Sequence, residues 1–136
     1  MAQMIRKGVD PFYTAPKRRA EKKPAYLDFI RKLPCCITGQ YGVEAAHTSF
    51  PSPMHGHHGR GRGTKAPDVF ALPLSSDAHR KSHAMNERQF WEEAGIDPHA
   101  LGLCLWALFS MYDPDEATER ATARIRQGIQ EAKANG

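Results

Sequence analysis

Cysteine is scarce in this chain, and long apolar runs are absent. Only three of the 136 residues are cysteines. The number is odd, and Cys35 and Cys36 are adjacent, so no disulfide framework is expected. Cys104 lies in an apolar helical run and is expected to be a small core residue. No stretch of about 18 consecutive apolar residues exists, and the N-terminus lacks the apolar segment of a secretory signal. We therefore expect a cytoplasmic protein that does not span a membrane.

Lysine and arginine are concentrated in two segments that contain few or no acidic residues. The formal net charge is only +4, but residues 1–24 hold seven Lys and Arg against two acids, and the segment "HHGRGRGTK" has no acid at all. Polyanions, and nucleic acid first among them, are the natural partners of such clusters. A solubilising tail is the alternative for the first cluster. The candidate nucleic-acid-binding residues are Arg18, Arg19, Arg60, Arg62 and Lys65.

Proline, glycine and capping residues divide the rest of the chain into short elements. Ser76 or Asp77 is expected to cap a helix that continues through 87–95, and Gly95 to end it. Asp97 followed by Pro98 is typical of a helix start. The predicted order is a helix at 24–34, a β-hairpin at 35–49, a long loop at 50–67, a strand at 68–75, and helices at 76–95, 96–112 and 113–133.

This order predicts a small α+β domain. We expect a basic arm at 1–23, the main domain at 24–112 and a C-terminal helix at 113–136. A loop as long as 50–67 in a compact domain is more often functional than idle. The C-terminal helix has few apolar residues and is expected to lie on the surface or to face a partner.

Histidines are concentrated in one part of the chain. Six of the seven lie between His47 and His83. His79 and His83 are four residues apart at the start of a predicted helix, so both can reach a single divalent ion from one face. His47 ends an earlier strand, after a tight turn.

The segments "LPCCITG", "VEAAHTS", "GRGTKAPDVFALPLSSDAHRKSH" and "ERQFWEEAGIDP" together resemble the HNH (ββα-metal, or His-Me finger) endonucleases. The similarity is greatest to a phage and prophage branch that contains the recombination enhancement function nucleases. It covers about residues 25–110. The resemblance implies a ββα-metal core with flanking helices, in a phage- or prophage-encoded protein of a bacterial host cell.

The resemblance also implies a mechanism. His47 matches the general base, and His79 and His83 match ligands of one divalent metal ion. That ion would be zinc in the purified protein, with magnesium or manganese as ions for activity. Histidine's ordinary pKa of about 6.5 suits proton removal from water near neutral pH. Phosphodiester hydrolysis in DNA is the implied reaction, with a recombinase filament as a further partner and a monomer or weak dimer as the state.

The sequence departs from the family pattern at the third metal ligand. Many relatives have a ligand where this chain has Ala46. His47 itself can then bind the ion, or a third ligand arrives from elsewhere, with His58 taken as the candidate. The others considered are Asp68, His57 and Asp77. Asp68 is favoured as a catalytic-site residue, either as ligand or as the group that orients His47.

Two further alternatives concern the cysteines and the function. The family's paired cysteines are missing, which excludes a four-thiolate zinc site, although Cys35 or Cys36 could join loop histidines in a mixed site. Trp91 and Trp106 are expected in the core rather than stacked on bases. A catalytically weak DNA-binding or recombinase-accessory protein is the main rival function, and a zinc-stabilised interaction domain is the other.

Overall fold

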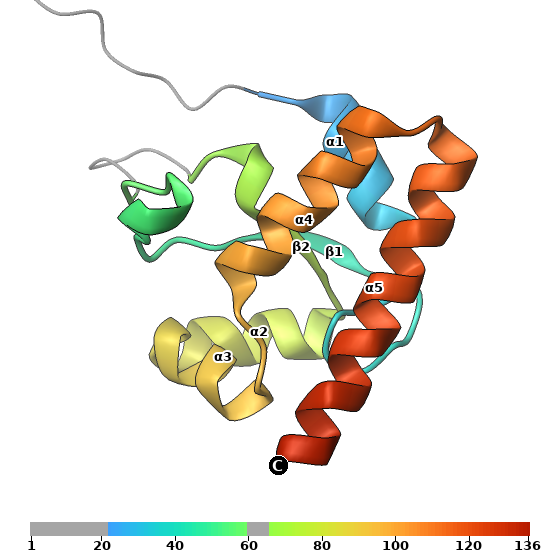
Figure 1. Ribbon diagram of the computed structural model, residues 1–136. Coiled ribbons are helices and arrows are strands. Elements are labelled where there is room, and N and C mark those ends of the chain that lie inside the picture. Colours follow the sequence, from blue (N-terminus) through green and yellow to red (C-terminus); the bar gives the residue numbers. More distant parts are fainter. Residues whose placement is uncertain (1–21, 60–65) are drawn as a thin grey trace, which may run out of the picture.

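A computed structural model describes residues 22–59 and 66–136 and shows a mostly helical domain built around a two-stranded sheet (Figure 1). This confirms the α+β class. Most of the predicted basic arm lies outside the described residues. In chain order the elements are α1 (Pro24–Arg31), β1 (Glu44–His47), the 3-10 helices η1 (Pro53–His55) and η2 (Asp68–Phe70), β2 (Ala71–Leu74), α2 (Ser76–Ala84), α3 (Glu87–Ala94), α4 (Pro98–Met111) and α5 (Pro114–Asn135).

The sheet pairs two strands that are distant in sequence. β1 runs antiparallel to β2, with Glu44 opposite Leu74 and His47 opposite Ala71. The hairpin predicted at 35–49 is therefore wrong, because its first half does not form a strand. Residues 35–40 close a tight turn instead, in which the Cys35 N–H donates to the Gln40 carbonyl over 2.7 Å. Gly39, with φ +79°, makes that turn in a conformation that other residues rarely adopt.

Loop 50–67, predicted to have no element of its own, contains the 3-10 helix η1, and the strand predicted at 68–75 begins instead with the 3-10 helix η2 and is a strand only in β2. η1 lies inside an isolated bridge between Ser52 and His57, and η2 leads directly into β2. Pro73 sits within β2, where its missing N–H costs little because the sheet has only two strands. Its carbonyl accepts a hydrogen bond from the Cys36 N–H at 3.0 Å.

Capping residues set most helix ends as the sequence indicated, but the helix predicted at 76–95 is divided into α2 and α3, because the Asn86 side chain accepts from the Gln89 N–H and caps α3. Asp97 caps α4 and Asp113 caps α5, each accepting two backbone N–H groups and each followed by proline. Gly95 ends α3 with a left-handed φ of +73°. The cap of α2, however, is Ser75 and not Ser76 or Asp77, because the Ser75 side chain accepts from the Ala78 N–H at 3.2 Å.

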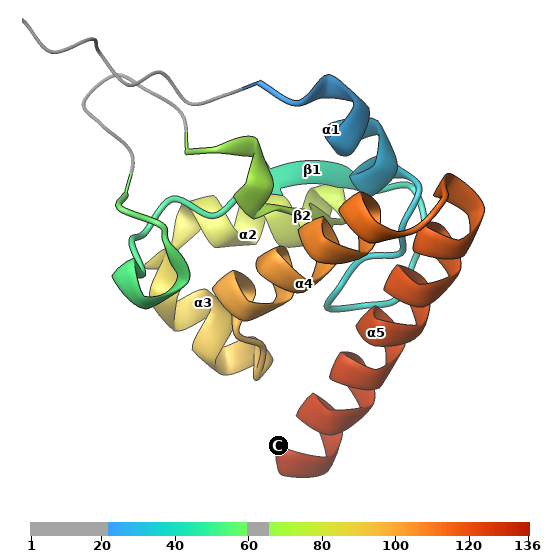
Figure 2. The same cartoon turned by 45° about the horizontal axis from the view of Figure 1, so that its top comes forward.

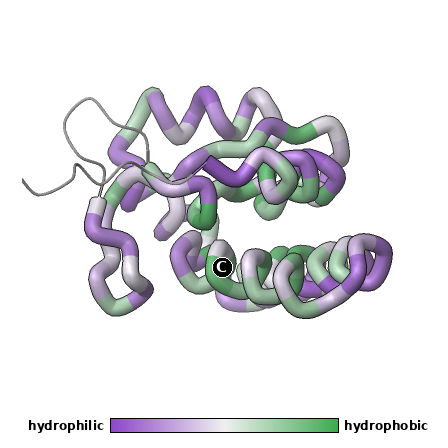
Figure 3. Tube along the Cα trace, turned by 90° about the horizontal axis from the view of Figure 1, so that it is seen from above, coloured by the Kyte–Doolittle hydropathy of each residue, from purple (hydrophilic) through white to green (hydrophobic). Residues whose placement is uncertain are grey.

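Helices bury the apolar sides of the sheet. α1 and α2 both pack against β1 and β2, and α4 packs against β2 and α5, an arrangement visible in two orientations (Figures 1 and 2). Hydrophilic and hydrophobic stretches alternate along the helices (Figure 3), as expected of helices with one buried side. The most deeply buried side chains include Tyr26, Ile30, Leu33, Leu72, Leu74, Leu105 and Ile125.

The C-terminal helix belongs to this core. Ala117, Ala121 and Ile125 of α5 are at most 1% exposed, so its small apolar face is covered by the domain. Trp91 is buried as predicted, whereas Trp106 is only partly buried, against Tyr26. No helix in the described part of the chain combines the length and the apolar character needed to cross a membrane.

Replacing Ser75 by alanine tests the cap of α2. Because the substitution leaves a helix N–H without its acceptor, the free energy of unfolding is expected to fall by about 1 kcal/mol. Urea denaturation followed by circular dichroism measures the change. Ser76→Ala is the control, expected to change stability by less than about 0.5 kcal/mol because Ser76 is exposed and the hydrogen bond from its hydroxyl to Glu44 lies at the surface. Equal losses in both variants would contradict the assignment of Ser75.

Candidate functional site

His47 lies at the end of β1, where a carboxylate holds its ring. Its Nε2 is 2.7 Å from Asp68 Oδ1, and the side chains of the pair are 23% and 13% exposed. An ionised carboxylate only accepts hydrogen bonds, so Nε2 carries the hydrogen and Nδ1 keeps the lone pair. Asp68 Oδ2 also accepts the backbone N–H of Lys23 at 2.7 Å. The contact with His47 Nε2 lets Asp68 restrain the orientation of the His47 ring.

The chain beyond His47 is fixed by three further contacts. The Thr48 N–H donates to the Phe70 carbonyl at 3.1 Å, which ties the strand end to η2. Ser49 donates to Glu87 of α3 through both its hydroxyl (2.6 Å) and its backbone N–H (3.1 Å). Hydrogen bonds to η2 and to α3 therefore fix the backbone immediately after His47.

A second histidine–carboxylate pair lies at the opposite end of β1. His79 Nδ1 is 2.7 Å from Glu44 Oε1, and the Ser76 hydroxyl donates to Glu44 Oε2 over 2.7 Å. The hydrogen bond from His79, and next that from Ser76, hold the pKa of the Glu44 carboxyl below its ordinary value. Glu44 was not among the residues predicted for the site, because its contact with His79 spans 35 positions in the sequence.

His79 and His83 are neighbours on α2, as their spacing predicted. Their ring centroids are 4.8 Å apart. Since His79 gives its Nδ1 hydrogen to Glu44, its Nε2 has the free lone pair, and metal-binding histidines commonly have such a carboxylate partner. The two imidazoles therefore suit a divalent ion in their donor chemistry. Across residues 22–59 and 66–136, however, no three His, Cys, Asp or Glu side chains gather closely enough to form a complete ligand set.

The two pairs are separate features of one strand. Glu44 and His47 are three residues apart, about 10 Å along an extended chain. Alternation along a strand sends their side chains to opposite faces, and each contacts a different element, α2 for Glu44 and η2 for His47. No hydrogen bond or ring contact joins His47 to His79 or His83 in the described structure.

The residues considered as third ligand lie in different surroundings. His58 is exposed. His57 is fully buried and uses both ring nitrogens, with Nε2 2.7 Å from the Thr48 carbonyl and Nδ1 accepting from the Gly59 N–H at 2.9 Å. It has no lone pair left for a metal ion. Asp77 is exposed and paired with Arg80.

The adjacent cysteines belong to the core and not to a mixed site. Both are fully buried, and no described group of three potential ligands includes either of them. Burial raises the pKa of the Cys36 thiol. Burial acts the same way on Cys35, but hydrogen bonds from Thr38, Ser75 and Ile37 outweigh it and lower the pKa of that thiol.

The predicted DNA-contacting residues are not part of the described structure. Arg18, Arg19, Arg60, Arg62 and Lys65 all lie in residues 1–21 or 60–65. Gly59 and Ala66, which flank the second segment, are described.

Fold and site together define a small α+β domain with a histidine–carboxylate pair at each end of its β1 strand. The chain belongs to the DUF968 family, described as "Protein of unknown function (DUF968)", whose model matches residues 7–108. This match takes in both pairs and most of α4.

A curated relative is also similar to this chain. "Uncharacterized protein YdfU" of Escherichia coli (strain K12) is 35% identical over 80 residues, which cover 55% of this chain and 21% of YdfU. The match thus spans about a fifth of the relative's length. No solved structure matches. Neither the family description nor the name of the relative mentions a nuclease.

Proposed function

We propose that this protein is a metal-dependent DNA endonuclease on an HNH-type ββα scaffold, acting in recombination or DNA processing of phage or prophage type. The observation that carries the proposal is the His47–Asp68 pair. A half-buried imidazole with one nitrogen bound to a carboxylate and the other free is the arrangement of a general base. The order of strand, strand and helix around it agrees with the resemblance seen in the sequence.

In the proposed reaction His47 activates water against a phosphodiester. Nδ1 of His47 takes a proton as the water oxygen attacks phosphorus, and the bond from phosphorus to the 3′ oxygen breaks. The 3′ oxygen then takes a proton from solvent, which gives a 5′ phosphate and a 3′ hydroxyl. Asp68 keeps the ring in the required tautomer and stabilises the positive charge that His47 acquires.

His79 and His83 would hold one divalent cation, with Glu44 as the group that orients His79. When bound, the cation supplies Lewis-acid stabilisation of the charge on the phosphate and the departing oxygen. Two imidazoles leave most positions of a cation open to water and to phosphate oxygens. Hydrolysis requires His47 and the cation to reach the same phosphodiester, and in the described structure the two pairs lie at opposite ends of β1 with no contact between them.

DNA is the proposed partner, and a recombinase filament is a further one suggested by the resemblance. The net charge of +4 and the acid-free segment at 57–65 support contacts to phosphate. Such contacts are made to phosphates and do not depend on base sequence. Because they are electrostatic, we expect affinity for DNA to fall steeply as the salt concentration rises.

The proposal is tested by a DNA-cleavage assay together with elemental analysis of the purified protein. The purified protein is expected to carry a divalent metal and to nick supercoiled plasmid when magnesium, manganese or zinc is supplied, with no cleavage in a chelator. Agarose gels that separate supercoiled from open-circular plasmid give the readout. Intact plasmid with all three ions, at protein concentrations that saturate DNA binding, would exclude the nuclease.

A catalytically weak DNA-binding or recombinase-accessory protein is the second candidate. Two observations favour it. Ala46 is a buried methyl group at the position where many HNH endonucleases carry a metal ligand. The described residues also provide no complete set of metal ligands. DNA binding that depends on salt, with no cleavage under any metal, would identify this function.

A further inference from the structure

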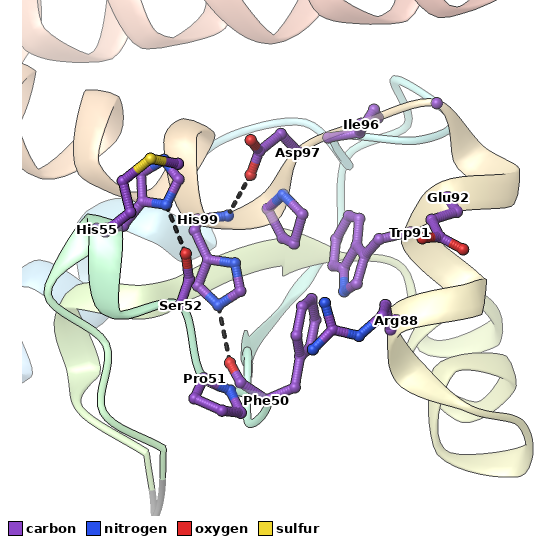
Figure 4. Close-up of a pocket in the computed structure, with 13 residues that line it drawn as sticks. Phe50, Pro51, Ser52, His55, Arg88, Trp91, Glu92, Ile96, Asp97 and His99 are labelled. Atoms are coloured by element: carbon purple, nitrogen blue, oxygen red, sulfur yellow. Dashed lines mark hydrogen bonds between the residues drawn. The ribbon is translucent and has the colours of Figure 1, made fainter.

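A pocket of about 440 Å³ opens between residues 50–55, α3 and the start of α4 (Figure 4). Its size lies within the roughly 300–1,000 Å³ of small-ligand sites. Phe50, one of its walls, follows His47 by three residues, so its Cα lies no more than about 11 Å from that of the proposed general base. None of the residues assigned above to catalysis or metal binding lines it.

The pocket contains a buried donor that lacks an acceptor. Trp91 is 2% exposed, and its Nε1 has no hydrogen-bond partner in the described structure. A buried donor left unpaired costs about 1–3 kcal/mol, so such a group calls for an explanation. Figure 4 shows the indole nitrogen of Trp91 close to the side chains of Arg88 and Phe50, which also line the pocket.

Arg88 and Glu92 add charged groups at the same place. The Arg88 guanidinium lies 4.8 Å over the ring of Phe50, which fixes a planar fork of donors at the edge of the pocket. Glu92 lines the pocket from the next turn of α3 and offers an acceptor. Donors and an acceptor are thus present within one small cavity.

Flat rings form the opposite wall. His99 is 3% exposed and stands edge-on to Phe50 with centroids 4.6 Å apart, while His55 stacks on His99 at 5.8 Å. His99 Nε2 is 2.8 Å from the Phe50 carbonyl, and burial lowers the pKa of His99 below its ordinary value. The wall is therefore fixed and aromatic, and burial favours the uncharged form of His99.

We propose that this pocket takes one unpaired nucleobase of the DNA strand that is cut, from a nucleotide close to the scissile bond. A base is planar and has carbonyl or ring-nitrogen acceptors for Trp91 and Arg88, together with ring or amino donors for Glu92. A phosphate group alone would leave the aromatic walls without a role and would be repelled by Glu92. This inference rests on the proposed nuclease function, and it makes single-stranded or locally opened DNA the substrate.

Fluorescence of Trp91 tests the pocket. Trp91 and Trp106 are the only tryptophans, so Trp106→Phe leaves Trp91 as the single indole. A labelled single-stranded decamer is titrated in this background, with anisotropy of the label reporting binding and tryptophan emission reporting the pocket. We expect a saturable change in emission that follows binding, and a much smaller change with fully paired duplex.

Arg88→Ala is the decisive variant, and Arg80→Ala is its matched control because Arg80 is an exposed arginine of α2 outside the pocket. Arg88→Ala is expected to weaken single-strand affinity about tenfold, in the range of one lost base contact, and Arg80→Ala less than about twofold. Circular dichroism checks that both variants fold.

The possible outcomes distinguish a failure of the pocket proposal from a failure of the nuclease proposal. Strand binding and cleavage with unchanged Trp91 emission, and with Arg88→Ala equal to the parent, would overturn the pocket proposal and leave the nuclease intact. Single-strand binding that changes Trp91 emission and depends on Arg88, without cleavage under any metal, would support the pocket and reject the nuclease.

Discussion

Replacing His47 by alanine is expected to abolish DNA cleavage while leaving affinity for DNA within about twofold of the parent. General-base catalysis contributes roughly 10²–10⁴-fold to a rate, and this ring has no described role in binding DNA. Its only hydrogen-bond partner in the described structure is Asp68. Rates of plasmid nicking and anisotropy of a labelled strand, measured on the same preparation, separate the two effects. Cleavage at the parental rate would remove His47 from the mechanism.

Asp68→Asn refines this result. The amide has nearly the shape of the carboxylate but can present a donor to the ring, so it no longer fixes the tautomer with a lone pair at Nδ1. We expect cleavage to slow at least 10–100-fold, with little change in the concentration that half-saturates binding. Asp28→Asn makes the same chemical change in an exposed ion pair with Arg31 and is expected to leave cleavage unchanged. Equal rates in the two variants would argue against a positioning role for Asp68.

The second large effect concerns bound metal. His79→Ala and His83→Ala are each expected to lower the divalent metal retained after dialysis from about one ion per chain to a small fraction, because each removes one of only two proposed imidazole donors. Elemental analysis by mass spectrometry measures the content. His55→Ala is the control, since His55 is bonded to Ser52 and lies outside the pair. Metal content that is unchanged in both helix variants would exclude the pair as ligands.

Glu44→Gln tests the carboxylate that sequence analysis did not predict. Groups that orient a metal-binding histidine typically contribute 10–100-fold to metal affinity. We therefore expect a metal dissociation constant raised by that factor, with the helix intact by circular dichroism. An unchanged dissociation constant would reduce the Glu44–His79 contact to a surface ion pair.

Local features were predictable because they depend on neighbours within one turn. Asp97 before Pro98 and Gly95 after an apolar run mark helix ends by the hydrogen bonds and dihedral angles that those residues alone provide. The proximity of His79 and His83 follows from helical geometry as soon as the segment is helical. Even here one position was wrong, since Ser75, Ser76 and Asp77 are all good caps and the start of the helix depends on where β2 ends.

The hairpin at 35–49 failed for a different reason. Its sequence contains the turn signal "TGQYG" between two short segments, and a hairpin prediction depends on such local signals. The alternative, pairing of β1 with β2 across 24 or more positions, depends on burying Leu72 and Leu74 against α1 and α4. No pattern within a short window contains that information.

The sequence by itself determined the α+β class, most helix boundaries, the paired histidines of α2, and His47 with Asp68 as candidate site residues. Only the tertiary structure decided that Asp68 meets His47, that Glu44 meets His79, and that Trp91 and Arg88 share a pocket beside Phe50. The physical reason is the range of the forces that act. Caps and helical spacing operate through the backbone of adjacent residues, whereas these contacts arise when distant segments pack around one core.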